Sequence, residues 1–491
     1  MYGSLSVAQL FGRFSSNAAV YGVSLVITRA GWILLLPIYW TRLSPEDYGI
    51  IGIAAAIQMF LNPVLSLGLY DAVQRFYFDW AENERRRRVA ALWIIALAWS
   101  AVVCGTLLAA GDALFGRIYT QVPFFPYLAA TVATAFFANF MQFPLATLRM
   151  RERAGLYGIL NVASFASQAA ITIALVIVYD QGVAGYLWGV AANAAVWAIV
   201  AVALMAKETT LSFRLSDARE PLRYALPTVP LAILDGLSSL LDRYFLDKHV
   251  GLRDIGLYNL GNQFGTAFSM FNVMMKTSWM PFLYRVVAER SDAPSIVSRF
   301  AVYYLTVLAV VALGVALLAK DLIDILGDPR YAGAYAYVPA FVLLYYIQAI
   351  AAAMGRGMDL AKKTALWPLV AMVSIVTAIV ALSLLVPAWG AQGAVAALVI
   401  AAGVRVTTQV ALSVHYYPRP LRLGQLVLMW GIALAAFWLG CTVPWPGLWS
   451  SIAGKTAIIA IAAVALARVG FGAAAFAAVL ARLSSARAKQ G

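Results

Sequence analysis

The stretch Leu-Ser-Pro-Glu-Asp-Tyr-Gly, residues Leu43–Gly49, returns 207 positions later as Val-Gly-Leu-Arg-Asp-Ile-Gly, residues Val250–Gly256. Each copy stands directly before a long apolar run. Asp47 and Asp254 occupy the same place in the two copies, and we expect each of them to cap the start of a helix. The match predicts that the chain contains two copies of one helical unit.

The composition around these copies is typical of a membrane protein. Of 491 residues, 63% are apolar and 12% are charged, whereas a soluble domain of this length carries far more charge on its surface. Apolar runs of about 20 residues, the length of a membrane-crossing helix, recur along the whole chain. We therefore expect an all-α membrane protein with about 14 transmembrane helices. The stretch Met1–Ser16 holds one cation and leads into the first run, so no cleavable signal is expected.

The distribution of Lys and Arg predicts the topology. Of these 36 residues, 25 fall in the two termini and in every second connection, seven fall in the other connections, and four fall inside predicted helices. A missed helix would invert this alternation, so we predict a multi-pass protein of the bacterial inner membrane with both termini in the cytoplasm. The net charge of +14 then reflects cytoplasmic loops and not nucleic-acid binding. The run Arg85–Arg88 is interpreted as a topology determinant.

A second match divides the chain into lobes. Gly182-Val-Ala-Gly185 returns 208 positions later as Gly390-Ala-Gln-Gly393. We expect a six-helix lobe over residues 1–206, a second over 207–416, and two further helices with a cytoplasmic tail over 417–491. Copies separated by six helices have the same orientation, so an axis along the membrane normal should relate the lobes and the substrate site should lie between them.

Charged residues inside predicted helices are the first candidates for a site, because each is costly within a bilayer. They are Arg29, Lys276, Arg405, Lys455 and Asp235. One carboxylate cannot neutralise these cations, so we expect Arg29, Arg405 and Lys276 to line a water-filled cavity that binds an anion. A diphosphate suits the planar fork of Arg and the point charge of Lys. Lys455 is expected to extend outward to water, so that its replacement is nearly silent.

Asp235 has two alternative roles. It pairs with Arg29 and locks the lobes together, or it couples transport to a proton or sodium gradient. Asn259, Asn262 and Gln263 follow the spacing i, i+3, i+4 and lie on one helical face, where they either line the cavity or join helices. No catalytic residue, metal site or cofactor is predicted, because the two cysteines lie in apolar segments and the two histidines are far apart.

Several segments together resemble polysaccharide-repeat flippases of the multidrug/oligosaccharidyl-lipid/polysaccharide exporter superfamily. They are Leu35–Gly49, Gly68-Leu with Arg75-Phe-Tyr-Phe78, Leu226-Pro with Asp242-Arg-Tyr-Phe-Leu246, Gly256-Leu-Tyr-Asn259 and Trp279-Met-Pro-Phe282. The resemblance implies two six-helix lobes around a cationic cavity. It also implies a substrate of undecaprenyl-diphosphate-linked oligosaccharide, an O-antigen or exopolysaccharide unit, which is moved from the cytoplasmic to the periplasmic leaflet. Expected partners are this lipid, membrane lipids, and a polysaccharide polymerase or other assembly proteins.

Three alternatives remain open. A lipid II flippase of cell-wall synthesis would share the fold and the cationic cavity. A cation-coupled antiporter of small molecules needs buried carboxylates, of which only Asp235 qualifies. A multispanning polymerase or ligase needs a catalytic cluster in an outer connection. The longest outer connections offer Asp112 with Arg117, Asp247 with His249, and Asp321, Asp324 and Asp328. The last group is interpreted as a solvated turn.

Overall fold

The computed structural model describes residues 24, 27, 28, 31, 32, 34–209, 215–326, 328–361 and 363–472. Over this part of the chain the regular structure is helical, with no strand. Ten helices are long and apolar enough to cross a membrane, and one of them, α14 (Trp367–Tyr416), consists of two helices joined at Gly390. The prediction of an all-α, multi-pass membrane protein is confirmed. Half of the first predicted membrane helix lies outside the described residues.

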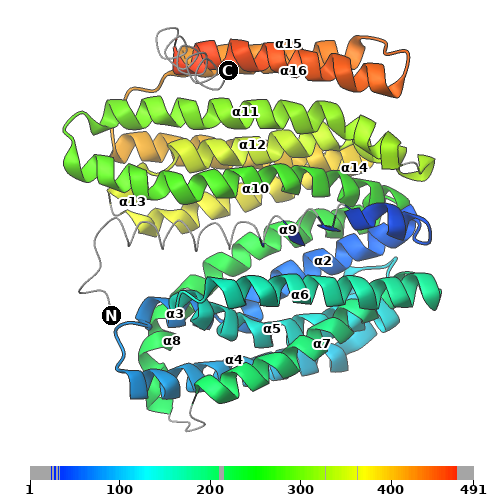
Figure 1. Ribbon diagram of the computed structural model, residues 1–491, viewed down its shortest axis with the longest axis vertical. Coiled ribbons are helices and arrows are strands. Elements are labelled where there is room, and N and C mark those ends of the chain that lie inside the picture. The colour runs from blue at the N-terminus through cyan, green and yellow to red at the C-terminus, as the bar shows by residue number, and fades with distance from the viewer. Residues whose placement is uncertain are drawn as a thin grey trace, which may run out of the picture. The chain divides into compact units, whose positions relative to one another are not determined.

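Two compact units make up the chain, Met1–Gly256 and Leu257–Gly491. The helices of the first unit are α2 (Pro45–Ser66), α3 (Leu69–Phe76), α4 (Glu82–Ile118), α5 (Ala129–Met150), α6 (Ala154–Ile173), α7 (Gly182–Glu208), α8 (Arg219–Ala225) and α9 (Val229–His249). The second unit contains most of α10 (Leu252–Glu289), and then α11 (Ala293–Leu326), α12 (Val338–Met354), α13 (Gly357–Leu360), α14, α15 (Leu423–Thr442) and α16 (Leu448–Phe471) (Figure 1). The predicted lobe boundary at 206 and 207 rests on the sequence repeat and stays a prediction.

Helix α2 begins at Pro45 because two side chains satisfy its first amides. Ser44 Oγ accepts a hydrogen bond from Asp47 N at 3.2 Å, and Ser44 N donates to Asp47 Oδ2 at 2.8 Å. Ser44 is therefore the cap and Asp47 is the third helical residue, which corrects the cap role expected for Asp47. Asp254 is likewise the third residue of α10. A carboxylate in the first turn interacts favourably with the helix dipole.

The second sequence match forms the same local structure in both copies. Gly182 and Gly390 have φ angles of +54° and +56°, a left-handed conformation that glycine adopts without strain. A β carbon on Gly185 would lie 3.1 Å from a carbonyl oxygen of the preceding helical segment, and one on Gly393 would lie 2.0 Å from such an oxygen. Each copy thus makes the same turn and the same close helix contact, which supports the predicted repeat.

The first sequence match brings two backbones into contact. A β carbon on Gly256 would lie 1.8 Å from Pro45 O and 2.9 Å from Gly49 N, and one on Gly49 would lie 2.3 Å from Leu252 O. The starts of α2 and α10 can approach this closely only because neither glycine has a side chain. The matched glycines of the two copies therefore touch each other.

Gly256→Ala is expected to destabilise the protein by about 1–3 kcal/mol or more, because the added methyl group meets backbone that cannot rotate away. The measurement is thermal unfolding of the full chain in detergent. Gly251→Ala is the matched control, since a β carbon on Gly251 meets nothing within 4 Å. Equal melting temperatures for the two variants would contradict the close contact of α2 with α10.

A buried ion pair attaches α16 to α11. Lys455 Nζ lies 2.6 Å from Asp321 Oδ2, and Ser451 Oγ donates to Asp321 Oδ1 at 2.6 Å. Lys455 is 5% exposed and Asp321 is 3% exposed, so the expected outward extension of Lys455 and the solvated position of Asp321 are both wrong. The physical reason is the length of α11, which continues to Leu326 and places Asp321 inside the helix and not in the turn after it.

Candidate functional site

The three predicted amide side chains of α10 have different surroundings. Asn259 is buried and has a partner within the protein. Asn262 Oδ1 accepts a hydrogen bond from Tyr345 OH of α12 at 3.0 Å, whereas Gln263 is exposed. Asn262 thus joins α10 to α12 inside unit 2, Asn259 is buried, and Gln263 is exposed. Their role in substrate binding stays a prediction.

Lys276, further along α10, belongs to a small charged cluster. Its side chain is exposed and interacts electrostatically with Arg356 and Asp359. Arg356 Nη1 pairs with Asp359 Oδ2 at 3.1 Å, and Trp367 Nε1 donates to Asp359 Oδ1 at 2.9 Å. Arg356 Nε is buried without a hydrogen-bond partner among the described residues. The cluster therefore contains two cations and one carboxylate whose oxygens are both engaged.

Arg356 is the cation of this cluster that was not predicted from the sequence to be a site residue. It lies in the short connection between α12 and α13, where its charge was attributed to the topology of the loop. Arg405 of α14 is partly buried and has contacts within the protein. One helical turn later, Gln409 Nε2 donates to Gly355 O, next to Arg356, at 3.3 Å. This hydrogen bond attaches α14 to the turn after α12.

The structure does not describe the side chains of two predicted site residues, Arg29 and Asp235. Arg29 lies outside the described residues, and for Asp235 only the backbone of α9 is described. The pairing of Asp235 with Arg29, and the convergence of Arg29 with Arg405 and Lys276, stay predictions.

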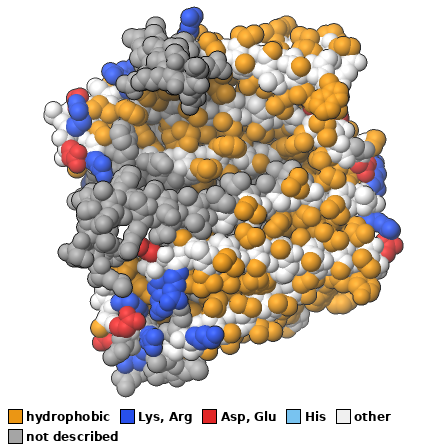
Figure 2. Space-filling view, viewed as in Figure 1, with side chains coloured by type: hydrophobic (Ala, Val, Ile, Leu, Met, Phe, Trp, Pro, Cys, Tyr) orange, Lys and Arg blue, Asp and Glu red, His pale blue; other side chains and the backbone are white. Residues whose placement is uncertain are grey.

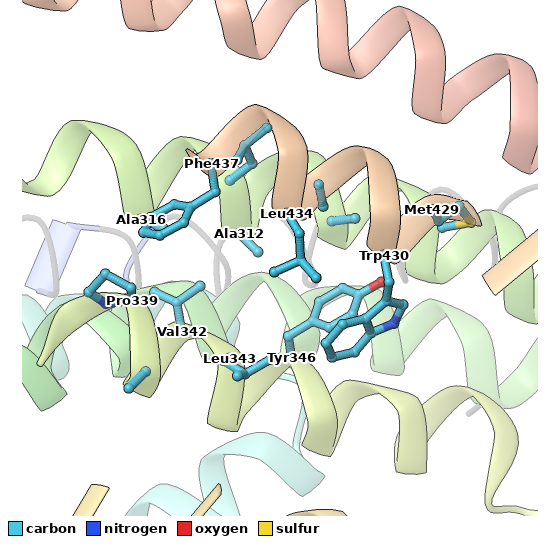
Figure 3. A pocket seen from close by; sticks show the side chains of 14 residues that line it. Ala312, Ala316, Pro339, Val342, Leu343, Tyr346, Met429, Trp430, Leu434 and Phe437 are labelled. Atoms are coloured by element: carbon cyan, nitrogen blue, oxygen red, sulfur yellow. The ribbon is translucent and has the colours of Figure 1, made fainter. Parts of the chain in front are cut away.

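An apolar cavity of about 250 Å³ lies between α11, α12 and α15 of unit 2 (Figure 3). Side chains such as Leu343, Trp430, Leu434 and Phe437 line it. The one hydroxyl group in the lining, that of Tyr346, donates to Leu305 O at 3.1 Å and is therefore satisfied. A cavity with this predominantly apolar lining suits a hydrocarbon chain.

The acidic residues that were candidates for an outer catalytic cluster bind groups of the protein itself. Asp247 is buried and accepts hydrogen bonds from the backbone nitrogens of Thr120 at 2.6 Å and Gln121 at 3.2 Å. Hydrogen bonding to Arg330 lowers the pKa of Asp328. The other contacts are Asp112 with Phe124 N at 3.2 Å, Asp324 with Lys320 at 2.8 Å, and Asp321 with Lys455. Among the described residues, no three His, Cys, Asp or Glu side chains are grouped to hold a metal ion.

Solved structures of transporters share this fold at low sequence identity. "Lipid II flippase MurJ, inward closed conformation" is 12% identical, with 92% of this chain and 98% of that chain covered and a TM-score of 0.74. An inward-facing multidrug resistance MATE family transporter of the MOP superfamily is 13% identical, with 79% and 97% covered and a TM-score of 0.62. An outward-facing MATE transporter is 15% identical, with 81% and 95% covered and a TM-score of 0.53.

No curated protein matches the chain by sequence. The sequence profile of a family described as "Polysaccharide biosynthesis protein" matches residues 41–335, which is more than half of the chain. This range contains the charged residues Asp235 and Lys276 and the amides of α10. The fold is thus that of the MOP-superfamily transporters, and the chain belongs to the polysaccharide biosynthesis protein family.

Proposed function

We propose that this protein is a flippase, and not an enzyme, which moves an undecaprenyl-diphosphate-linked oligosaccharide from the cytoplasmic to the periplasmic leaflet. The oligosaccharide is an O-antigen or exopolysaccharide repeat unit. Membership of a polysaccharide biosynthesis family favours such a unit over lipid II. In this proposal, Arg29, Arg405 and Lys276 bind the diphosphate, and no cofactor takes part.

The observation that carries this proposal is the excess of positive charge around Lys276. Lys276 is exposed on a long helix of a membrane protein and interacts with Arg356, while the neighbouring carboxylate of Asp359 already binds Arg356 and Trp367. A charge at membrane depth is tolerated where it faces water or a counter-ion. A diphosphate supplies that counter-ion, because Arg and Lys bind phosphate oxygens with charge-assisted hydrogen bonds.

The apolar cavity of unit 2 fits the polyprenyl chain of the same substrate. A polyprenyl chain is a hydrocarbon, and contacts with Leu434 and Phe437 stabilise it through the hydrophobic effect. Exposed amides such as Gln263 are suited to sugar hydroxyl groups. One unit thus offers an anion-binding cluster, an amide and a hydrocarbon site, which are the three chemistries of a lipid-linked oligosaccharide.

Translocation needs two states of the protein and no bond cleavage. Repacking of two lobes around a bound head group exposes it first to one side and then to the other, while the lipid chain stays in the bilayer. The difference in affinity between the two states drives the cycle.

Deletion of the gene tests the function. The expected result is accumulation of an undecaprenyl-diphosphate-linked oligosaccharide on the cytoplasmic leaflet, measured by lipid extraction and mass spectrometry. Accumulation of lipid II would assign the chain to cell-wall synthesis instead. Normal levels of both lipids, with normal polysaccharide export, would contradict a flippase.

Asp235→Asn separates the two roles proposed for this carboxylate. If Asp235 couples transport to a proton or sodium gradient, the variant loses gradient-dependent transport, because asparagine cannot change charge. The measurement compares transport with and without an imposed gradient. Full activity of the double variant Asp235→Asn, Arg29→Gln would contradict coupling and identify a dispensable ion pair.

A further inference from the structure

The connection between α14 and α15 places an arginine in the interior of unit 2. Figure 2 shows Lys and Arg side chains mainly toward the left and right ends of the visible face, while hydrophobic side chains cover its middle. Arg419, in the middle of the connection 417–422, is by contrast 7% exposed. Its Nη2 donates hydrogen bonds to Met354 O, at the end of α12, and to Ser413 Oγ of α14, the latter at 3.5 Å. Arg419 therefore caps the carboxyl end of α12, where a cation also interacts favourably with the helix dipole.

Two further side chains, both from α14, bind the turn that follows α12. Ser413 Oγ donates to Met354 O at 3.0 Å and accepts a hydrogen bond from Gly357 N at 2.6 Å. Gln409 Nε2 donates to Gly355 O at 3.3 Å. Ser413 is 0% exposed and Gln409 is 4% exposed, so these hydrogen bonds are shielded from water. The turn is thus fixed on both sides of the one residue that separates its two glycines.

That residue is Arg356, and its neighbours Gly355 and Gly357 carry no side chain. A β carbon on Gly355 would overlap Gln409 Nε2, and one on Gly357 would overlap Ser413 O. The close packing of the turn against α14 therefore depends on both glycines. Arg356 is the side chain that this fixed turn presents.

The side chain of Arg356 belongs to the charged cluster around Lys276. The two cations interact electrostatically. Asp359 orients the guanidinium group of Arg356 at 3.1 Å, and this group lies 5.8 Å from the ring centroid of Trp367. An arginine and a lysine held at a fixed separation suit the two phosphoryl groups of a diphosphate, because the guanidinium fork binds two oxygens and the ammonium group binds another.

We propose that Arg356 binds the diphosphate of the lipid-linked oligosaccharide together with Lys276, and that Arg419 is the positioning residue of Arg356. Arg419 does not touch the substrate. With Ser413 and Gln409 it holds the turn from which Arg356 extends, and a binding group is effective only when its supporting residues fix its position. The inference rests on the proposed function, since it assigns further residues to the same diphosphate site.

Binding of farnesyl diphosphate to the purified full chain in detergent tests this inference, with farnesol as the reference that lacks the diphosphate. Dissociation constants are measured for the wild type, Arg356→Gln, Arg419→Gln, Ser413→Ala and the double variant Arg356→Gln, Arg419→Gln. Ser413→Ala removes a single hydroxyl group and leaves the charge unchanged. It therefore tests the support of the turn even if Arg419→Gln does not fold.

Each kind of substitution has a matched control. Arg422→Gln removes a cation from the same connection as Arg419, but Arg422 bonds to Gln425 at 3.4 Å and not to the turn. Ser383→Ala removes an exposed hydroxyl group of α14 that bonds to Val380 O within its own helix.

We expect the affinity for farnesyl diphosphate to fall about tenfold in Arg356→Gln and about three- to tenfold in Arg419→Gln and Ser413→Ala, and to stay unchanged in both controls. In the Arg356→Gln background, Arg419→Gln should cause no further loss, because a positioning residue acts only through the residue that it positions. A merely structural role of Arg419 would lower the affinity equally in both backgrounds.

The inference is overturned if Arg356→Gln binds farnesyl diphosphate as tightly as the wild type, or if Arg419→Gln weakens binding equally with and without Arg356. Equal losses in Arg419→Gln and Arg422→Gln would also overturn it, because net charge would then explain the binding. A wild type that binds farnesyl diphosphate no more tightly than farnesol would instead contradict the proposed diphosphate site itself, and this inference with it.

Discussion

Arg405→Ala and Arg29→Ala are each expected to stop export of the polysaccharide while the amount of protein in the membrane stays unchanged. The reason is that each arginine supplies charge-assisted hydrogen bonds to the diphosphate, and a lost bond of this kind weakens binding at least about tenfold. Arg→Lys at either position is expected to restore export only partly, because lysine lacks the planar fork that binds two oxygens at once. The measurement is surface polysaccharide per cell, with protein level determined by immunoblot.

Arg330→Ala is the control for charge removal. Arg330 is 48% exposed and pairs with Asp328 in a short helical segment after α11, so its loss should leave export unchanged. Normal export in both Arg405→Ala and Arg29→Ala would contradict the cationic cavity. A fall in protein level in step with export would indicate a structural role for these arginines.

Lys455→Ala is expected to destabilise the protein by about 3–5 kcal/mol, because it leaves the buried carboxylate of Asp321 without its counter-ion. From the sequence alone, this substitution was expected to be nearly silent. The double variant Asp321→Leu, Lys455→Met should regain much of the stability, since apolar side chains of similar volume remove the uncompensated charge. The free energies of unfolding of the wild type, Lys455→Ala and the double variant are measured by denaturant unfolding in detergent, followed by tryptophan fluorescence.

Lys320→Ala is the matched control on the same helix as Asp321. Lys320 pairs with Asp324 at 2.8 Å, but its side chain is 56% exposed, so its loss should cost about 0–1 kcal/mol. Equal losses of stability in Lys455→Ala and Lys320→Ala would show that burial of the Asp321 pair has no energetic consequence.

The sequence predicted the fold well because the signals for membrane helices and repeats are local and strong. Apolar runs of a fixed length define the helices, and Gly182 with Gly390 marks a backbone conformation that only glycine adopts easily. The match between Gly49 and Gly256 was visible in the sequence, but that the two backbones touch is shown only by the structure. The family resemblance pointed to the family that the sequence profile shows.

Side-chain partners were harder to predict, because they depend on contacts between distant segments. Lys455 and Asp321 are 134 positions apart, and nothing local in either segment indicates the other. Arg356 was overlooked for a similar reason, since it lies 80 positions after Lys276 and their electrostatic interaction depends on the fold. Asn259, Asn262 and Gln263 share a helical face by spacing, yet Asn259 is buried, Asn262 binds Tyr345 and Gln263 is exposed.

Translocation by the purified protein tests the central claim most directly. The chain is reconstituted into liposomes that contain an undecaprenyl-diphosphate-linked oligosaccharide, and an impermeant glycosidase reports the fraction of sugar on the outer leaflet over time. We predict that the protected fraction becomes accessible at a rate that increases with the amount of protein and falls to the protein-free rate in Arg405→Ala. A rate equal to that of protein-free liposomes for the wild-type chain, with the protein correctly folded, would contradict the account.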